Sequence, residues 1–194
     1  MTMDIRTILW TGGMDSTFLV LQSAHDDHAV QPVYVAVSPT KSIRDAEVRR
    51  AVLGTMPERL ASRIGKEIVV APPEVYADIR NLRLGLIETW ITVGGRDDQF
   101  PYNQVVAVAV ARLLGSTVYV GTCSDDRCRG ADWGESNAVM MPLRHVRKAD
   151  MVREAAAKGW LPILATTHSC IMLGTEHCGS CVECLKRKNA GMTL

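Results

Sequence analysis

The sequence predicts an α/β fold: a Rossmann-like parallel sheet with helices on both faces, followed by a short cysteine-rich tail. Two observations carry this prediction. Short apolar segments alternate with longer amphipathic ones along the 194 residues, which is the order of strands and helices in a parallel sheet. The first apolar segment runs into two glycines that open a helix, the usual strand-to-helix turn of this fold class. A chain of this length is most simply one domain.

The strands and helices are expected in alternation. Apolar stretches bounded by turn residues predict strands at residues 7–10, 33–37, 68–71 and 117–120. Helices are predicted at residues 15–24, from a capped start at Ser42 and Asp45 to a break at Pro57, and at 84–93, 103–114, 148–158 and 182–188. We expect residues 1–194 to form a single domain, with residues 166–190 as a metal-binding C-terminal subregion.

The composition is that of an ordinary soluble globule. Apolar residues make up 47% of the chain and charged residues 22%. The net charge of +1 gives no support to direct binding of nucleic acid or of a membrane surface. No apolar run reaches membrane-spanning length, and the N-terminus does not resemble a secretory signal. We expect a cytoplasmic protein whose oligomeric state is open, with a homodimer as one option.

Residues 9–16 read Leu-Trp-Thr-Gly-Gly-Met-Asp-Ser and form the most informative motif. The glycines allow backbone amides to approach an anion, and the N-terminus of the helix that follows favours negative charge. A Walker loop is absent because no stretch has its glycine, lysine and hydroxyl spacing. A dinucleotide loop needs a further glycine where Asp15 and Ser16 stand. A turn without a ligand is the simpler alternative, but the complete strand, loop and helix favour phosphate binding.

Four of the six cysteines stand close together near the C-terminus: Cys170, Cys178, Cys181 and Cys184. Four soft ligands in so short a span suit a tetrahedral zinc ion, and Gly179 allows a tight turn between two of them. Disulfides are less favoured in a chain without an export signal. An iron–sulfur cluster and a catalytic dithiol are alternatives, and His168 or His177 could replace a cysteine. We predict one structural Zn²⁺ per chain, bound by the four cysteines.

The segment from Thr11 to Ser16 resembles the pyrophosphate loop of the PP-loop ATP pyrophosphatases, usually written Ser-Gly-Gly-x-Asp-Ser. The resemblance implies an adenine nucleotide alpha hydrolase-like fold that cuts ATP between its α and β phosphates. It implies that the nucleotide is held by Thr11, Gly12, Gly13, Met14, Asp15 and Ser16, with Asp15 and Ser16 also catalytic. A carboxylate cannot bind phosphate favourably, so Asp15 would help to hold Mg²⁺ or the loop amides.

The two motifs together resemble the 7-cyano-7-deazaguanine synthases of the queuosine pathway. That family ends in Thr-x-Ser-Cys, a short loop and Cys-Gly-x-Cys-x-x-Cys-x-x-Arg, and this chain has the same pattern at residues 167–170 and 178–187. Residues 141–143 and 148–150 also resemble the family's Thr-Pro-Leu and Lys-Ala-Glu. The resemblance implies a carbon–nitrogen ligase: ATP activates the carboxylate of 7-carboxy-7-deazaguanine, ammonia gives an amide, and a second ATP drives dehydration to the nitrile preQ0.

The resemblance also implies roles for three further residues. Lys148 would neutralise charge on the phosphates in catalysis, Asn103 would bind the purine-like base, and Asp125, or its neighbour Asp126, would contact the substrate. A solvated lysine and a helix cap are the simpler roles for Lys148 and Asn103. One departure stands out: the family's aromatic-Gly-Gln-basic-His stretch is replaced by Ser-Pro-Thr-Lys-Ser at residues 38–42.

Two other functions stay open from the sequence. A sulfurtransferase of the same superfamily would adenylate a nucleic-acid base and needs an exposed persulfide-bearing cysteine. A zinc-stapled nucleotide-binding subunit without catalysis is the other. Cys123 and Cys128 stand in the loop that would cover the site, and we expect them to be structural rather than nucleophilic.

Overall fold

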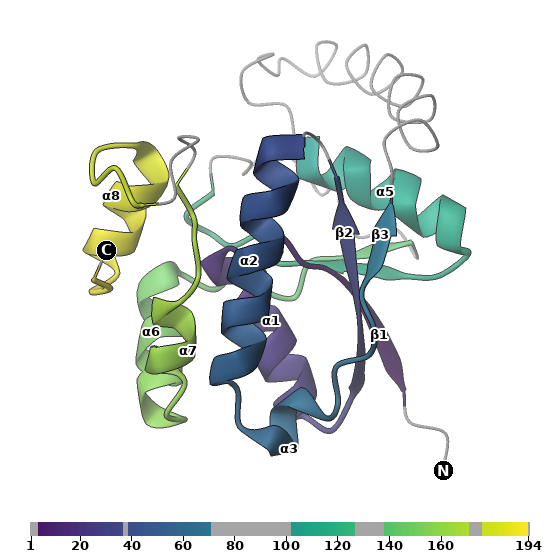
Figure 1. The fold of residues 1–194 in the computed structure, drawn as a ribbon, viewed down its shortest axis with the longest axis horizontal. Coiled ribbons are helices and arrows are strands. Elements are labelled where there is room, and N and C mark those ends of the chain that lie inside the picture. Colours follow the sequence, from purple (N-terminus) through teal and green to yellow (C-terminus); the bar gives the residue numbers. More distant parts are fainter. Residues whose placement is uncertain (1–3, 37–38, 71–101, 127–137, 171–175, 194) are drawn as a thin grey trace.

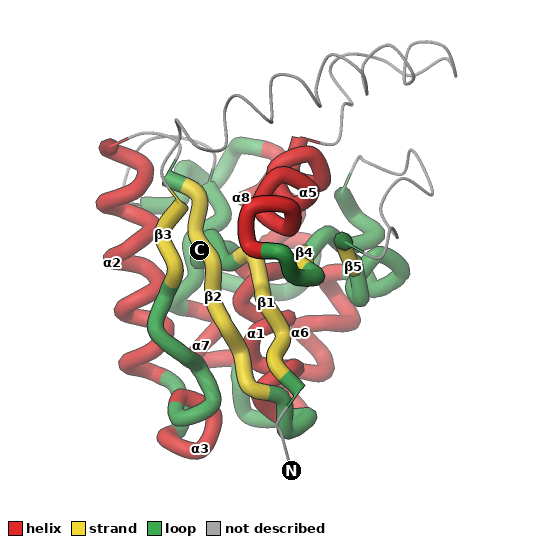
Figure 2. Tube along the Cα trace, turned by 90° about the vertical axis from the view of Figure 1, so that its right-hand side faces the viewer, coloured by secondary structure: helices red, strands yellow, loops and turns green. Residues whose placement is uncertain are grey.

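A five-stranded sheet forms the centre of the fold in the computed structural model, which describes residues 4–36, 39–70, 102–126, 138–170 and 176–193. The strands are β1 Ile5–Leu9, β2 Ala29–Val35, β3 Ile68–Val70, β4 Val118–Val120 and β5 Val139–Met140. Their order is β3-β2-β1-β4-β5, and every pairing is parallel. Figure 2 shows β3, β2 and β1 side by side. The predicted parallel sheet is confirmed, whereas β5, with two residues, is too short to carry a sequence pattern.

The helices cover both faces of this sheet (Figure 1). They are α1 Met14–His25, α2 Pro39–Thr55, α3 Glu58–Ala61, α5 Tyr102–Leu114, α6 Lys148–Ala157, α7 Leu161–Ala165 and α8 Val182–Asn189. One core cluster joins α1, α2, α3, α6 and α7 to one face, and a second joins α5 to the other. Successive side chains of a strand point to opposite faces of the sheet, so Ile8 belongs to the first cluster and its neighbour Leu9 to the second. The helix predicted over residues 84–93 lies outside the described part of the chain.

Strand β2 begins four residues before its predicted start and contains Pro32. A proline inside a sheet is tolerated only where its missing N–H has no partner to lose. The N–H and the carbonyl of Val30 both bond toward the segment that leads into β3, to Arg63 and Gly65, so alternate residues of β2 face that side. Pro32 therefore also faces the segment that leads into β3. It comes one residue before Val33, which pairs with Ile68, the first residue of β3. Pro32 thus lies between an isolated bridge at Val30 and Ile64 and the first pair of β2 with β3.

Helix α2 corrects the predicted capped start at Ser42 and Asp45. The helix begins at Pro39, a residue type whose fixed φ suits a first turn, so both polar residues lie inside it. Asp45 is buried and accepts a hydrogen bond from the Tyr34 hydroxyl at 3.0 Å instead of capping the helix. The predicted break at Pro57 is confirmed, because this residue is the N-cap of α3.

The strand order places a topological switch point between β1 and β4. From β1 the chain continues to β2 on one side, while β4 lies on the other, and folds of this kind bind ligands at the carboxyl ends of such strands. At this point Gly121, directly after β4, lies against the start of α1. A Cβ on Gly121 would come within 2.7 Å of the backbone nitrogen and Cα of Ser16. The absence of a side chain at Gly121 therefore lets the end of β4 reach the helix N-terminus.

Gly121→Ala should therefore destabilise the protein. Overpacking against backbone costs about 1–3 kcal/mol, because neither segment can move aside like a flexible side chain. We expect thermal unfolding of the variant to start roughly 2–10 °C lower than in the wild type. Gly54→Ala is the matched control: a Cβ there meets no atom within 4 Å, so its stability should be unchanged or slightly higher. Equal melting temperatures for the two variants would contradict the close approach.

Within the described residues, no helix combines the length and the apolar character needed to cross a membrane.

Candidate active site

A cleft of about 370 Å³ lies at the carboxyl ends of β1 and β4. The size is within the range of small-molecule sites. Four parts of the chain line it: the loop after β1 with the start of α1, helix α2, the end of β4 with the loop that follows, and the tail. Helix α2 contributes Lys41, Arg44 and Asp45. Its full lining is Leu9, Thr11, Gly13, Met14, Asp15, Ser16, Lys41, Arg44, Asp45, Val120, Gly121, Thr122, Asp126, His168, Ser169, Cys170 and Glu183.

The loop between β1 and α1 has the backbone of an anion cradle. Gly12 adopts φ +82°, a left-handed conformation that favours glycine, and a Cβ there would lie 3.1 Å from Val48 Cγ1. Gly13 is the N-cap of α1 and provides no side-chain cap, so the helix end faces the cleft with its positive dipole. The hydroxyls of Thr11 and Ser16 lie 3.3 Å apart on the same loop. The glycines, two hydroxyls and the N-terminus of α1 thus lie together on one short loop, which are the groups that phosphate binding uses.

The cysteine-rich tail closes this loop from the other side. The Met14 N–H donates to Ser169 Oγ at 3.2 Å, and the His168 N–H donates to the Gly12 carbonyl at 3.2 Å. These bonds join segments about 155 positions apart in sequence. The tail is therefore part of the cleft wall and not an appended module.

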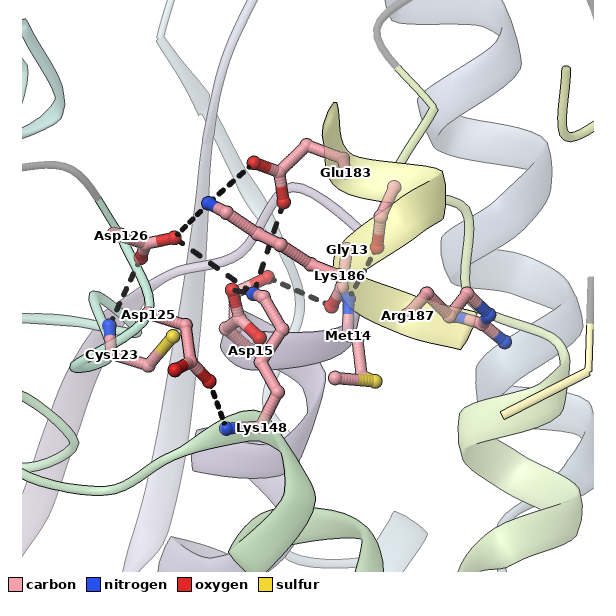
Figure 3. A network of polar contacts seen from close by, with 12 residues as sticks. Gly13, Met14, Asp15, Cys123, Asp125, Asp126, Lys148, Glu183, Lys186 and Arg187 are labelled. Atoms are coloured by element: carbon pink, nitrogen blue, oxygen red, sulfur yellow. Dashed lines mark hydrogen bonds and ion pairs between the residues drawn. The ribbon is translucent and has the colours of Figure 1, made fainter. Parts of the chain in front are cut away.

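Lys148 lies beside Asp15, just outside the lining of the cleft, and lines a neighbouring cavity of about 300 Å³ (Figure 3). Its side chain is buried, and its ammonium group forms an ion pair with the Asp15 carboxylate. Burial acts to lower the pKa of Lys148, but the carboxylates of Asp15 and Asp126 outweigh it and raise the pKa above its ordinary value. The lysine is thus a permanent cation at the first turn of α1, where the sequence resemblance expects a group that neutralises phosphate.

Asp15 titrates near neutrality. Burial raises its pKa to about 6, although the Lys148 ammonium acts in the opposite direction. A carboxyl with a raised pKa is neutral below that pKa and ionised above it. The charged pair with Lys148 therefore exists in full only above about pH 6.

Activity that depends on ionised Asp15 should therefore rise with pH up to about 6 and then level off. The expected slope below this pH is about tenfold per unit, as for one proton. The pH profile of kcat/KM for pyrophosphate release measures this slope and the pH at which the activity levels off. Asp15→Asn removes the titrating group, so its residual activity should have no limb near pH 6; a limb that persists in this variant would assign the titration to another group.

The two neighbouring aspartates after β4 have different positions. Asp126 lines the cleft and accepts the Cys123 N–H at 3.0 Å and the Lys186 ammonium at 3.0 Å. Burial acts to raise its pKa, but Lys148, Lys186 and the Cys123 N–H together lower it. Asp125 accepts the Lys148 backbone N–H at 2.6 Å and so caps α6 from outside the cleft. Of the two, Asp126 lines this cleft, whereas Asp125 is exposed and lines the neighbouring cavity together with Lys148 and Lys186.

The four tail cysteines come together in a geometry that fits zinc. Their sulfur atoms all lie within 4.8 Å of one another. The Cys170–Cys181 and Cys178–Cys184 sulfur pairs are 3.9 and 4.0 Å apart, close to the about 3.8 Å expected between the ligands of tetrahedral zinc. Gly179 adopts φ +73°, which confirms its predicted use in the tight turn. The cluster can therefore hold the predicted metal ion with little rearrangement.

The tail is anchored to the domain by a buried arginine. Arg187, three residues after the last cysteine, is 1% exposed. Its guanidinium donates to Thr167 Oγ1 and to the Leu164 carbonyl, both at 2.8 Å. Burial lowers its pKa, yet not enough to discharge an arginine at physiological pH. These bonds fix α8 against α7.

Several expected site residues are thus brought together, and others are not. The loop residues, Lys148 and the tail share one region. Asn103 lies in the first turn of α5, but its side chain is outside the described atoms. Cys128 lies outside the described part of the chain. The sequence analysis did not assign Lys41, Arg44, Ser169 or Glu183 to the site, and it considered His168 only as an alternative metal ligand. Two signals were present in the sequence: Ser169 belongs to the Thr-x-Ser-Cys pattern, and Glu183 stands next to Cys184.

Comparisons with known proteins add one partial match. A family model described as "Queuosine biosynthesis protein QueC" matches residues 116–193. This segment is less than half of the chain and includes Lys148, Asp126 and the four tail cysteines, but not the glycine loop. A search of curated proteins finds no match.

One solved structure that matches is described as a predicted subunit of tRNA methyltransferase from Methanocaldococcus jannaschii. It is 20% identical, with a TM-score of 0.48 over 79% of this chain and 74% of that one. Similarity at this level carries no argument about function.

Proposed function

We propose that the chain is an ATP-dependent carbon–nitrogen ligase that converts 7-carboxy-7-deazaguanine and ammonia to 7-cyano-7-deazaguanine. The observation that carries the proposal is the pairing of Lys148 with Asp15 on the Thr-Gly-Gly-Met-Asp-Ser loop. This loop supports pyrophosphate release, because it has the cradle of a phosphate site and no Walker lysine. The match of residues 116–193 to the QueC model supports the deazapurine acceptor.

The first step is adenylation of the acceptor. A carboxylate oxygen of the acceptor attacks the α-phosphorus of ATP, the bond to the β-phosphate breaks, and pyrophosphate leaves. The amides and hydroxyls of residues 11–16 would hold the departing pyrophosphate, and Lys148 would neutralise its growing charge. The acyl-adenylate has AMP as a good leaving group in place of a carboxylate oxygen.

The remaining steps use ammonia and a second ATP. Ammonia attacks the acyl carbon, AMP leaves and one proton is lost, which gives the amide. The amide oxygen then attacks the α-phosphorus of a second ATP, with loss of pyrophosphate and a proton. Elimination of AMP and another proton completes the nitrile. Each nitrile thus requires two ATP and releases two pyrophosphates.

Asp15 and Asp126 are the residues that fit a role toward Mg²⁺. Their carboxylate oxygens and the Cys123 sulfur lie within 4.8 Å of one another. Mg²⁺ prefers oxygen ligands and is usually bound by one or two carboxylates together with substrate phosphates. The two aspartates therefore fit the ion, whereas the thiol does not. Bound Mg²⁺ would screen the phosphate charge and orient the triphosphate.

The position of Cys123 gives no support to a sulfurtransferase. Its side chain is 3% exposed, and burial raises its pKa to about 12. A thiol that stays protonated and covered is a poor nucleophile and a poor carrier of a persulfide.

The experiment that tests the proposal follows pyrophosphate and product mass together. The protein is incubated with ATP, Mg²⁺, ammonium and 7-carboxy-7-deazaguanine. We expect the nitrile and two pyrophosphates per product. Ser16→Ala, which removes a loop hydroxyl but no zinc ligand, should reduce both by about 10²-fold with zinc content unchanged.

Other outcomes would change the assignment. Amide with one pyrophosphate per product would restrict the reaction to its first half. ATP binding without any pyrophosphate would indicate a non-catalytic subunit and contradict the proposed function.

A further inference from the structure

Four charged side chains form a closed ring beside the cleft (Figure 3); its two carboxylates line the cleft, and its two lysines line the neighbouring cavity. Its two cations are Lys148 and Lys186, and its two anions are Asp126 and Glu183. Each anion contacts both lysines, so the signs alternate around the ring. Asp126 comes from the loop after β4, Lys148 from α6, and Glu183 and Lys186 from α8. All four side chains are at least three-quarters covered.

The distances around this ring are unequal. Lys186 Nζ lies 3.0 Å from Asp126 Oδ1 and 2.7 Å from Glu183 Oε1. Lys148 Nζ lies 3.9 Å from Asp126 Oδ1 and 3.9 Å from Glu183 Oε2. Both carboxylates are therefore bound closely by Lys186 and only distantly by Lys148. Asp15 is the close partner of Lys148.

We propose that Lys186 is a positioning residue that keeps Asp126 and Glu183 from forming close ion pairs with Lys148, whose close partner is Asp15. By holding Asp126 and Glu183, Lys186 prevents these carboxylates from competing with the incoming phosphate for the Lys148 ammonium. Without Lys186, Lys148 at 3.9 Å is the nearest cation to Asp126 Oδ1 among the residues that the structure describes, and the two should form a direct pair. The proposal rests on the proposed function for the role of Lys148, but not for the geometry of the ring.

The cysteine-rich tail sets the position of Lys186 and Glu183, which both lie in α8. Glu183 stands between the ligands Cys181 and Cys184, in the first turn of α8. The Cys181 side chain is the N-cap of this helix and accepts the Cys184 N–H at 3.5 Å. The same residues that can bind the metal therefore fix the start of α8. The tail thus sets the charge distribution beside the cleft.

The test compares Lys186→Met with Lys186→Arg and with Lys188→Met. Lys188 is the matched control because it is an exposed lysine on the same helix that lies outside the ring, with its ammonium group donating to the Gly179 carbonyl at 3.0 Å. We expect Lys186→Met to lower kcat for pyrophosphate release about tenfold, with a change in the KM for ATP below about twofold. Lys186→Arg should restore at least about half of the activity, because it returns the charge. Lys188→Met should match the wild type.

A second measurement is independent of turnover. In a crystal structure of Lys186→Met, Asp126 Oδ1 and Lys148 Nζ should approach from 3.9 Å to a direct ion pair, at about 2.8 Å. Zinc content should stay at the wild-type value. An unchanged separation together with unchanged kcat would overturn the proposal, as would a loss of activity fully explained by loss of zinc. A wild type that releases no pyrophosphate would contradict the proposed function alone, since the crystal structure still decides the positioning role.

Discussion

Replacing Lys148 with methionine should reduce pyrophosphate release by about 10²–10³-fold, the usual cost of losing a preorganised charge at a reacting group. Methionine keeps most of the apolar stem that α6 buries, so the loss reports the ammonium group. The measurement is steady-state pyrophosphate release at pH 8, where Asp15 is ionised in the wild type. Lys66→Met is the control, since Lys66 is an exposed lysine outside the cleft and should give wild-type rates.

The same variant should have a distinctive pH dependence of stability. Lys148 acts to lower the pKa of both Asp15 and Asp126, so its removal raises both values in the folded state. A carboxyl whose folded pKa is raised binds its proton more tightly in the folded state than in the unfolded state. Its stabilising contribution is present at low pH and is lost as the pH rises through the folded value. The deficit in unfolding free energy of Lys148→Met against the wild type should therefore widen from pH 5 to pH 8; a constant deficit would contradict the ion pair.

The Cys184→Ser variant should lose zinc and unfold at a much lower temperature. Cys184 is fully buried, and its sulfur lies 4.0 Å from that of Cys178, so serine removes one ligand from the centre of the cluster. A structural zinc contributes about 10–16 kcal/mol to the folding of small zinc domains, and even a fraction of this should lower the melting temperature by roughly 10 °C or more. Metal analysis and thermal unfolding measure the two effects.

Cys123→Ser is the matched control for this variant. Cys123 is equally covered but lies outside the sulfur cluster, so its replacement should cost some stability and leave one zinc per chain. A full equivalent of zinc in Cys184→Ser would disprove the ligand assignment. Iron in place of zinc in the wild-type protein would support the alternative that the four cysteines bind an iron–sulfur cluster.

Loss of the metal should also weaken nucleotide binding. The bonds from Met14 to Ser169 and from His168 to Gly12 join the tail to the phosphate loop, and Ser169 immediately precedes the ligand Cys170. ATP affinity of Cys184→Ser, measured below its melting temperature, should therefore fall while that of Cys123→Ser does not.

Local sequence patterns predicted most of the fold. Each strand of the predicted sheet has a run of apolar residues, and helices such as α1 and α6 start and end within one or two residues of expectation. The start of α2 was wrong because Pro39 and the capping pattern at Ser42 compete, and a local pattern does not show which one the tertiary contacts use. The loop at residues 11–16 and the four cysteines were also visible, because each motif is short and its chemistry depends on spacing along the chain.

The close contacts among distant segments were not predictable in this way. Spacing indicated phosphate chemistry in the Thr-Gly-Gly-Met-Asp-Ser loop and metal binding in the tail, since both depend on neighbours in sequence. The choice between Asp125 and Asp126, the burial that raises the Asp15 pKa, and the ring that includes Lys186 depend on how β4, α6 and α8 pack. Electrostatic interactions act through space and vary with burial. The fold therefore brings two separate motifs into one cleft, where the cysteine-rich tail is hydrogen-bonded to the loop at residues 11–16.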